Sequence, residues 1–474
     1  MLYWLIAVFH LVVMSAAVLH ALICKRDHRA ALGWMGVIII FPIAGPLLYF
    51  LFGINRVRTK AKSFTGRRIP ALHFGYERST RTDRPFHEPL LGHMPHPHLA
   101  EVGGRATRHP LIKSSHVTAL YNGEAFFPRL IGALDDAENL AFVSSYLFAA
   151  NGVAREVIDA LCRAAERGVD TRVMIDGVGA LYSFRRALRP LRRAGVKVAL
   201  FAPPQLLPPT LDINLRNHRK IAVIDNRVGF FGGINVDHRH MVEAEDNRHP
   251  TEDVHFQARG PVVSALHELF GRDWHMVTGT EVPPPTPPEP SGNTRCRVID
   301  DGPDDTLNHL AMTLNGVFAA ARKRITIMMP YFLPSADMIA MLQAAVLRGV
   351  QVSVVLPERS NLPYVDWASR NMLWELVLWD VAVYYKPAPF AHTKLVIVDD
   401  HYVLAGSANL DARSLRLNFE LGVEVFDDEL ALELQAHVQR AIAVSTPVTL
   451  ESLDGRPLWQ RIRDAAFWLF SSYL

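Results

Sequence analysis

Two segments of the chain repeat one set of chemically capable residues at one spacing. Each reads His-x-Lys-x₄-Asp-x₆-Gly-(Gly/Ser)-x-Asn. A lone His-x-Lys carries no information, but two copies that agree at six positions indicate a shared function. The repeated residues are His218, Lys220, Asp225, Gly232, Gly233 and Asn235 in the first copy, and His392, Lys394, Asp399, Gly406, Ser407 and Asn409 in the second.

These residue types suit phosphate chemistry. A lysine supplies a positive charge, an asparagine amide donates hydrogen bonds, and small residues let the backbone approach a phosphoryl oxygen. Two imidazoles brought to one phosphorus atom can divide the work, because one attacks while the other protonates the leaving alkoxide. Two lysines without a convergent carboxylate cluster argue against metal ligation by the histidines. We therefore expect no metal and no cofactor.

The elements that position these residues also repeat. Apolar β-branched residues follow each His-x-Lys, so we predict strands in which His218 and Lys220 share one face, as do His392 and Lys394. Residues 141–176 and 325–357 each read as a strand, a tyrosine-bearing loop, a helix ending in Arg-Gly-Val and a second strand. This alternation predicts an α/β fold of two pseudo-twofold-related halves with mixed, largely parallel sheets, and an active site between the halves.

Composition shifts along the chain mark the expected domain boundaries. A run of prolines lies between the two repeats and cannot continue a helix or a central strand. We expect a two-helix membrane anchor (1–55), a basic, Pro- and His-rich linker (56–115), a first catalytic half (116–280), a proline-rich linker (281–293), a second catalytic half (294–447) and an amphipathic tail (448–474).

The anchor prediction depends on two long apolar runs, residues 2–24 and 30–52. Each approaches the ~20 residues that cross a bilayer as a helix, so we predict two transmembrane helices preceding the catalytic halves. A buried helical hairpin in a soluble domain is the alternative. Residues 56–68 carry six basic residues and no acidic one. The positive-inside rule then predicts a multi-pass protein of the inner membrane with a cytoplasmic catalytic part, whose basic flank faces an anionic membrane surface.

The net charge of +3 hides an asymmetry along the chain. Residues 1–70 carry nine Lys and Arg against one acidic residue, and the remainder is mildly acidic. This distribution weighs against nucleic acid as a partner. The three cysteines, Cys24, Cys162 and Cys296, lie far apart, which excludes a disulfide framework.

The paired motif resembles the phospholipase D superfamily, and the match is closer to its bacterial cardiolipin synthase branch. The resemblance includes residues 45–53 at the end of the second apolar run, the Pro-Tyr-Phe at 330–332 and the run from 406 to 420, and it spans nearly the whole chain. It implies an enzyme that transfers a phosphatidyl group between two phosphatidylglycerol molecules through a phosphohistidine, with release of glycerol. Phosphatidylglycerol and membrane lipid would be its partners.

The resemblance also implies a role for each repeated residue. His218 would be the nucleophile, and His392 the general acid and then the base. The lysines and asparagines of both copies would hold the phosphoryl oxygens, with Gly233 and Ser407 beside them. Glu420 and Asp253 would orient the histidines. Asp225 and Asp399 fall at the turn after each strand, where a structural role competes with a catalytic one.

Several alternatives stay open at this point. A hydrolytic phospholipase D, or a transferase that uses another alcohol, has the same paired motif. A nuclease of the superfamily fits the acidic body and the anchor less well, and an inactive membrane scaffold fits the intact motifs less well. The tail from Trp459 to Leu474 has an apolar stripe that suits either the membrane interface or packing on the body. The sequence does not indicate an oligomeric state.

Overall fold

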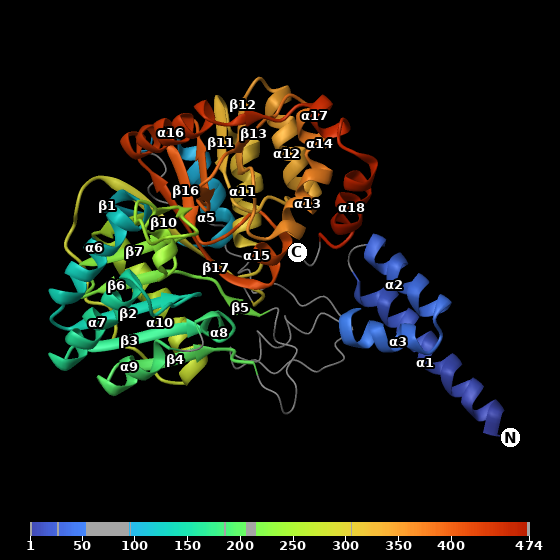
Figure 1. Ribbon diagram of the computed structural model, residues 1–474, viewed down its shortest axis with the longest axis horizontal. Coiled ribbons are helices and arrows are strands. Elements are labelled where there is room, and N and C mark those ends of the chain that lie inside the picture. The colour runs from blue at the N-terminus through green and yellow to red at the C-terminus, as the bar shows by residue number, and fades with distance from the viewer. Residues whose placement is uncertain are drawn as a thin grey trace. The chain divides into compact units, whose positions relative to one another are not determined.

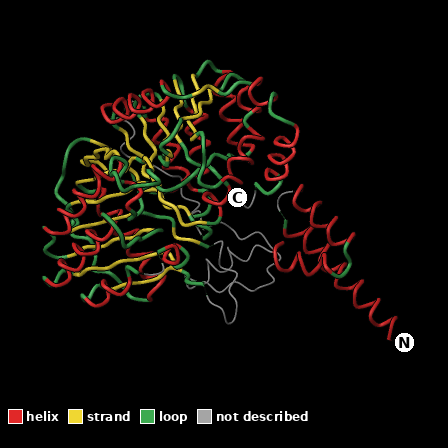
Figure 2. The backbone as a smooth tube through the Cα atoms, in the orientation of Figure 1, coloured by secondary structure: helices red, strands yellow, loops and turns green. Residues whose placement is uncertain are grey.

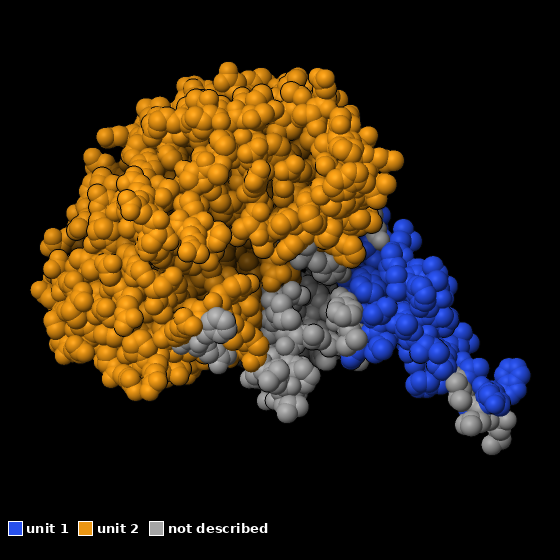
Figure 3. Space-filling view, viewed as in Figure 1, with its two compact units in different colours: residues 1–83 blue, residues 84–474 orange. Residues whose placement is uncertain are grey.

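The computed structural model describes residues 2–25, 28–53, 94, 96–183, 186–204, 215–304 and 306–471. The chain forms two compact units, Met1–Asp83 and Arg84–Leu474 (Figure 3). The basic segment 56–68 lies outside the described residues.

The first unit contains α1 (Leu2–Cys24), α2 (His28–Ile40), α3 (Ala44–Leu48) and the π-helical turn η1 (Tyr49–Gly53). Among the described residues, α1 alone is long and apolar enough to span a membrane. The prediction of a second transmembrane helix over residues 30–52 was wrong, because the chain turns after Ile40, next to Pro42. Thirteen residues of α2 extend only about 20 Å, short of the ~30 Å hydrocarbon core.

The short helices of this unit pack back on α1 and α2. A Cβ atom added to Gly45 would lie 2.4 Å from the carbonyl oxygen of Val37, so the approach of α3 to α2 requires glycine at this position. The Tyr49 hydroxyl lies 2.8 Å from His20 Nδ1, and its ring meets Trp34 edge-on at 5.4 Å. These contacts join all three helices into one small bundle.

One sheet runs through both halves of the second unit. The first half has β1 (Ile112–Tyr121), β2 (Leu140–Ser145), β3 (Asp170–Asp176), β4 (Lys197–Phe201), β6 (Ile221–Ile224), β7 (Val228–Gly232) and β9 (Val254–Arg259). The second has β10 (Thr294–Asp301), β11 (Arg324–Met328), β12 (Gln351–Pro357), β13 (Ala382–Lys386), β15 (Leu395–Val398), β16 (Tyr402–Gly406) and β17 (Asn418–Phe426). The first half has the order β4-β3-β2-β6-β7-β9-β1 and the second β13-β12-β11-β15-β16-β17-β10, with the two-residue strand β18 (Thr446–Pro447) added outside β13, and β1 pairs with β10. The halves are therefore two copies of one topology.

The prediction of largely parallel sheets was only partly right. Strands β2, β3 and β4 are parallel, as are β11, β12 and β13, but the strands from β6 to β1 and from β15 to β10 pair antiparallel. Short turns after Ile224 and after Val398 cause the difference, since a tight turn can join only antiparallel neighbours. Asp225 and Asp399, the first residues of these turns, have φ values of 50° and 55°.

Helices cover both faces of the sheet (Figures 1 and 2). They are α6 (Asn122–Asp135), α7 (Val153–Glu166), α8 (Gly179–Tyr182), α9 (Leu188–Arg193) and α10 (Val262–Thr278) in the first half, and α11 (His309–Ala320), α12 (Ala336–Leu347), α13 (Pro363–Met372), α14 (Trp374–Val377), α15 (Ala412–Arg416), α16 (Asp428–Ala443), α17 (Leu450–Asp454) and α18 (Leu458–Trp468) in the second. One hydrophobic cluster includes residues of α10, of α16 and of strands from both halves, which fixes the halves against each other. A second cluster lies in the first half, and a third lies mainly in the second.

One segment differs from the sequence-based expectation. Helix α5 (Pro97–Thr107) and the start of β1 lie within 56–115, where we expected a linker, and α5 packs against α11. The proline-rich stretch 281–290 contains no helix or strand, as expected. In the tail, α18 packs against α13, and the Trp367 and Phe467 rings meet at 4.9 Å.

Candidate active site

The two His-x-Lys segments lie just before their strands and not within them, which corrects the sequence-based placement. Each joins a two-residue strand, β5 (Arg216–Asn217) or β14 (Phe390–Ala391), to β6 or β15. The alternation of side chains still holds. Arg219, between His218 and Lys220, points away and pairs with the buried Asp273.

The short strands cross from one half to the other. Strand β5 pairs in parallel with the start of β17, and β14 pairs in parallel with β8 (Thr251–Glu252). The backbone N–H of His218 then donates to the Phe419 carbonyl at 2.9 Å, and that of His392 donates to the Glu252 carbonyl at 2.7 Å. Each of these backbone hydrogen bonds fixes a histidine next to an acidic residue of the other half, because Glu420 follows Phe419 and Asp253 follows Glu252.

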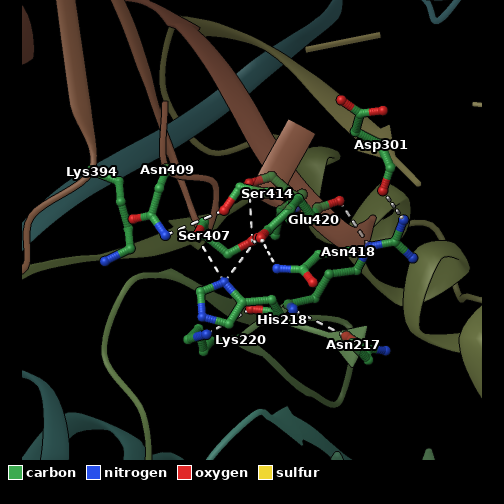
Figure 4. Close-up of polar contacts among 12 residues, drawn as sticks. Asn217, His218, Lys220, Asp301, Lys394, Ser407, Asn409, Ser414, Asn418 and Glu420 are labelled. Atoms are coloured by element: carbon green, nitrogen blue, oxygen red, sulfur yellow. Dashed lines mark hydrogen bonds and ion pairs between the residues drawn. The ribbon is translucent and has the colours of Figure 1, made fainter. Parts of the chain in front are cut away.

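Both acidic residues bind an imidazole. His218 Nδ1 lies 3.1 Å from the Glu420 carboxylate and 3.1 Å from the Ser407 carbonyl oxygen (Figure 4). His392 Nδ1 lies 2.7 Å from the Asp253 carboxylate. A carboxylate at Nδ1 holds the proton on that nitrogen and leaves Nε2 available as a nucleophile or base. These contacts favour the tautomer in which His218 Nε2 is free to attack phosphorus; at His392, Lys394 Nζ also lies 2.9 Å from Nδ1.

Burial sets the charges of these groups. It lowers the pKa of His218, and it lowers the pKa of His392 well below the usual value, with Lys394 and Lys220 adding to the effect. Both imidazoles are therefore neutral before an anion binds. Burial also raises the pKa of Asp253 to about 6. Burial opposes ionisation of Glu420 too, but the imidazole of His218 beside it holds the pKa of Glu420 below its usual value.

Two buried lysines lie beside the histidines. Lys220 Nζ donates to the His218 carbonyl at 2.7 Å, and Lys394 Nζ donates to the His392 carbonyl at 2.5 Å. Burial lowers the pKa of Lys220 to about 7 and that of Lys394 to about 8. Two ammonium groups held away from water form a site for an anion, whose charge would stabilise their protonated forms.

The asparagines and the small residues lie around this centre. Asn235 Oδ1 accepts from the Leu147 N–H at 3.1 Å, and Asn409 Nδ2 donates to Ser414 Oγ at 3.3 Å. Ser407 Oγ donates to Glu420 at 2.5 Å, and a Cβ atom on Gly233 would lie 2.4 Å from Asp253. The structure thus places Ser407 and Gly233 against the two carboxylates, whereas the sequence suggested contact with substrate.

The structure does not bring Asp225 and Asp399 to the histidines. The Asp225 carboxylate accepts hydrogen bonds from the backbone N–H groups of residues 138, 139 and 140 at 2.7–2.9 Å. Asp399 does the same for residues 322, 323 and 324. We therefore assign both a structural role, which was one of the two interpretations left open.

Two tyrosines that the sequence analysis did not identify as site residues complete the site. The Tyr146 ring meets His218 edge-on at 5.2 Å and lies 5.5 Å from Lys220 Nζ. The Tyr331 ring meets His392 edge-on at 6.3 Å. Both come from the tyrosine-bearing loop of the repeated unit. Their matching positions in the two copies could have identified them as site residues.

Comparison with known proteins agrees with this geometry. The family described as "Cardiolipin synthase, PLD-like domain" matches residues 130–274 and 315–442, which hold both motifs. The chain belongs to the cardiolipin synthase family of the phospholipase D superfamily. A second family, "Phospholipase_D-nuclease N-terminal", matches residues 2–53.

Full-length relatives within the cardiolipin synthase family are similar to the chain. It is 31% identical over 445 residues to cardiolipin synthase A of Pseudomonas aeruginosa, covering 92% of this chain and 89% of that protein. It is 29% identical over 467 residues to the major cardiolipin synthase of Bacillus subtilis, covering 95% of each. The phosphatidylserine synthase structure from Haemophilus influenzae has the same fold, with a TM-score of 0.59 at 15% identity over 79% of this chain and 100% of that one.

Proposed function

We propose that the chain is a cardiolipin synthase, a phosphatidyltransferase that joins two phosphatidylglycerol molecules and releases glycerol. The observation that supports it is the paired site, in which each histidine is oriented through Nδ1 by a buried carboxylate of the other half. The two Nε2 atoms would face one phosphodiester whose oxygens the lysines bind.

The first step forms a covalent intermediate. His218 Nε2 attacks the phosphorus of the donor, a P–N bond forms, and the bond from phosphorus to the headgroup glycerol oxygen breaks. His392 Nε2 gives its proton to that oxygen, and glycerol leaves. The bound anionic phosphodiester favours protonation of His392, because an opposite charge raises the pKa of an imidazole.

The second step reverses the proton transfer. A headgroup hydroxyl of a second phosphatidylglycerol gives its proton to His392 Nε2 while its oxygen attacks phosphorus. The P–N bond breaks, and its electron pair returns to His218. Cardiolipin leaves, and no oxidant, reductant or metal is consumed. Water in place of the lipid hydroxyl would give phosphatidic acid, which is the hydrolase alternative, and another alcohol would give another phosphatidyl ester.

We propose that α1 anchors the enzyme in the inner membrane with the catalytic part in the cytoplasm. With a single span, the basic residues between α1 and α2 and those at 56–68 follow the same helix, so the positive-inside rule places them on one cytoplasmic side. The multi-pass anchor predicted from sequence would need α2 and α3 to cross the bilayer together as an interrupted helix.

Helix α18 supports a further contact of the catalytic part with an anionic lipid surface. Trp459 and Ile462 on this helix, and Leu469 directly after it, are exposed at 61–72%. On the opposite side the buried Asp464 pairs with Arg456 and Arg463. An apolar face of this kind suits the membrane interface. We expect Ile462→Asp to reduce flotation of the protein with anionic vesicles, and Ala466→Ser, on the same face, to leave it unchanged.

A direct assay tests the proposed activity. Purified protein is incubated with labelled phosphatidylglycerol in detergent–lipid micelles, beside the His218→Ala and His392→Ala variants. We expect cardiolipin and glycerol from the unmodified protein and neither product from the variants. Phosphatidic acid as the only product would establish a hydrolase, and no lipid product at all would overturn the assignment.

Quenching in alkaline detergent, in which the P–N bond of a phosphohistidine survives, separates the roles of the two histidines. With a donor whose leaving group needs no protonation, such as a nitrophenyl phosphatidyl ester, we expect labelled protein from His392→Ala and none from His218→Ala. The reverse labelling would assign the nucleophile to His392.

A further inference from the structure

The two halves differ in the segment that links the motif to its orienting acid. Asp253 follows Asn235 by eighteen positions, but Glu420 follows Asn409 by only eleven. The longer segment of the first half contains the one-turn helix η4 (His238–His240) and lies beside the histidine of the second half, since the rings of His240 and His392 are 6.0 Å apart. The catalytic steps described above do not use this segment.

Hydrogen bonds hold η4 rigidly. His240 is buried, with Nδ1 on the Thr251 carbonyl at 3.2 Å and Nε2 accepting from the Asn235 N–H at 3.4 Å. His238 Nδ1 accepts from the Val153 N–H at the start of α7. Asn247 Nδ2 donates to the Arg239 carbonyl at 2.9 Å. The backbone around Arg239 is therefore fixed from both sides.

Arg239 is the residue that this fixed turn presents outward. Its side chain is 43% exposed, and its Nε lies 2.9 Å from Asp237, whose carboxylate also accepts from the Arg239 backbone N–H. Among the described residues, Asp237 is its only carboxylate partner. A contact through Nε leaves the two terminal nitrogens as the fork that binds phosphate oxygens. Arg239 precedes His240, whose ring lies 6.0 Å from that of His392, so η4 carries the guanidinium at the His392 end of the site.

The chemistry places the acceptor lipid at this end of the site. If His218 attacks phosphorus, the leaving alcohol departs on the opposite side, toward His392, and the acceptor hydroxyl enters from there. Released glycerol carries no charge, but the headgroup of the acceptor phosphatidylglycerol carries its own phosphodiester beyond the attacking hydroxyl. A cation beside His392 would therefore meet a second phosphate only during transfer to a lipid.

We propose that Arg239 binds the phosphate of the acceptor phosphatidylglycerol, the phosphate that is not attacked, and so favours transfer over hydrolysis. This inference rests on the proposed function. Arg413 is a matched control, because it lies four positions after Asn409, just as Arg239 lies four positions after Asn235. Arg413 lies on α15 toward the other end, within electrostatic range of Tyr146, the neighbour of His218.

The test measures how the phosphohistidine is partitioned between two acceptors. Unmodified protein, Arg239→Ala, Arg239→Lys and Arg413→Ala are incubated with labelled phosphatidylglycerol, and cardiolipin and phosphatidic acid are counted in the same samples. We expect Arg239→Ala to lower the ratio of cardiolipin to phosphatidic acid about tenfold, the size of one lost charge-assisted hydrogen bond. Arg239→Lys should recover part of the ratio, and Arg413→Ala should keep that of the unmodified protein.

A neutral acceptor gives a second readout, which a misfolded variant would not reproduce. Exchange of labelled glycerol into phosphatidylglycerol needs no second phosphate, so Arg239→Ala should reduce exchange much less than cardiolipin formation. An equal fall in both, or a lower product ratio in Arg413→Ala alone, would overturn the proposal. Absence of cardiolipin with unmodified protein would instead overturn the proposed function.

Discussion

The Asp253 carboxylate, in the first half, lies 2.7 Å from Nδ1 of His392, in the second half. The pseudo-equivalent pair, Glu420 and His218, makes the same contact in the opposite direction at 3.1 Å. Neither motif histidine therefore takes its orienting carboxylate from its own half. The continuous sheet through β1 and β10, and the hydrophobic cluster shared by both halves, keep these cross contacts in place.

The contacts of Asp253 with His392 and of Glu420 with His218 predict that neutralising either acid greatly lowers the catalytic rate. Asp253→Asn and Glu420→Gln keep the shape of each side chain but remove the charge that holds the Nδ1 proton. We expect each variant to lose about 10²-fold or more in kcat, measured as cardiolipin formed under saturating phosphatidylglycerol, because the imidazole loses its orientation and its tautomer. A rate within twofold of the unmodified protein would show that the carboxylates do not act through the histidines.

The buried lysines predict opposite responses of activity and stability to pH. The pKa of Lys220 is about 7 and that of Lys394 about 8, so raising the pH removes the ammonium groups that bind phosphate. We expect kcat/KM to fall above pH 7–8. The unfolded chain keeps these protons to a higher pH, so their contribution makes the free energy of unfolding rise with pH over the same interval.

Lysine substitutions test this origin of the pH dependence. Lys220→Arg retains its charge at all these pH values, so the alkaline fall of kcat/KM should move to higher pH even where the absolute rate is lower. Chemical denaturation at pH 7 and pH 9 measures how the free energy of unfolding changes with pH. An unchanged alkaline limb in Lys220→Arg would exclude Lys220 as the titrating group.

The turn aspartates predict a loss of stability without a loss of chemistry. Asp225→Ala removes three hydrogen bonds from backbone N–H groups to a carboxylate, so we expect the free energy of unfolding to fall by about 2–4 kcal/mol. The rate per folded molecule should stay within twofold. Asp135→Ala, which breaks the exposed pair with Arg163, is the control and should cost under about 1 kcal/mol. A catalytic role would instead lower the rate of a stable Asp225→Ala protein.

A single-span anchor predicts which side of the membrane holds the residues after α1. In a Cys24→Ser background, a cysteine at position 28 should react with a membrane-impermeant maleimide only after spheroplasts are lysed. A cysteine at position 3, at the start of α1, should react in intact spheroplasts and serves as the positive control. Labelling of position 28 in intact spheroplasts would support a multi-pass anchor.

The sequence by itself determined which residues carry the chemistry and that the fold is duplicated. Identical spacing in two copies identified His218, Lys220, His392 and Lys394, because a repeated pattern is visible without any coordinates. The resemblance added Glu420 and Asp253. The helix over residues 153–166 and the strands around it could also be predicted from the sequence, because their signals are local. These signals are a periodic spacing of apolar residues and a glycine after the helix.

Only the tertiary structure decided which groups meet. The pairing of β5 with β17 and of β14 with β8 joins residues about 140 to 200 positions apart, and no local pattern encodes such contacts. Tertiary contacts also put Ser407 and Gly233 against the orienting carboxylates, gave Asp225 and Asp399 backbone N–H partners in place of histidines, and brought η4, which carries Arg239, beside His392. The second apolar run shows the same limit, because composition gives its hydrophobicity but not the turn after Ile40 that makes α2 too short to span.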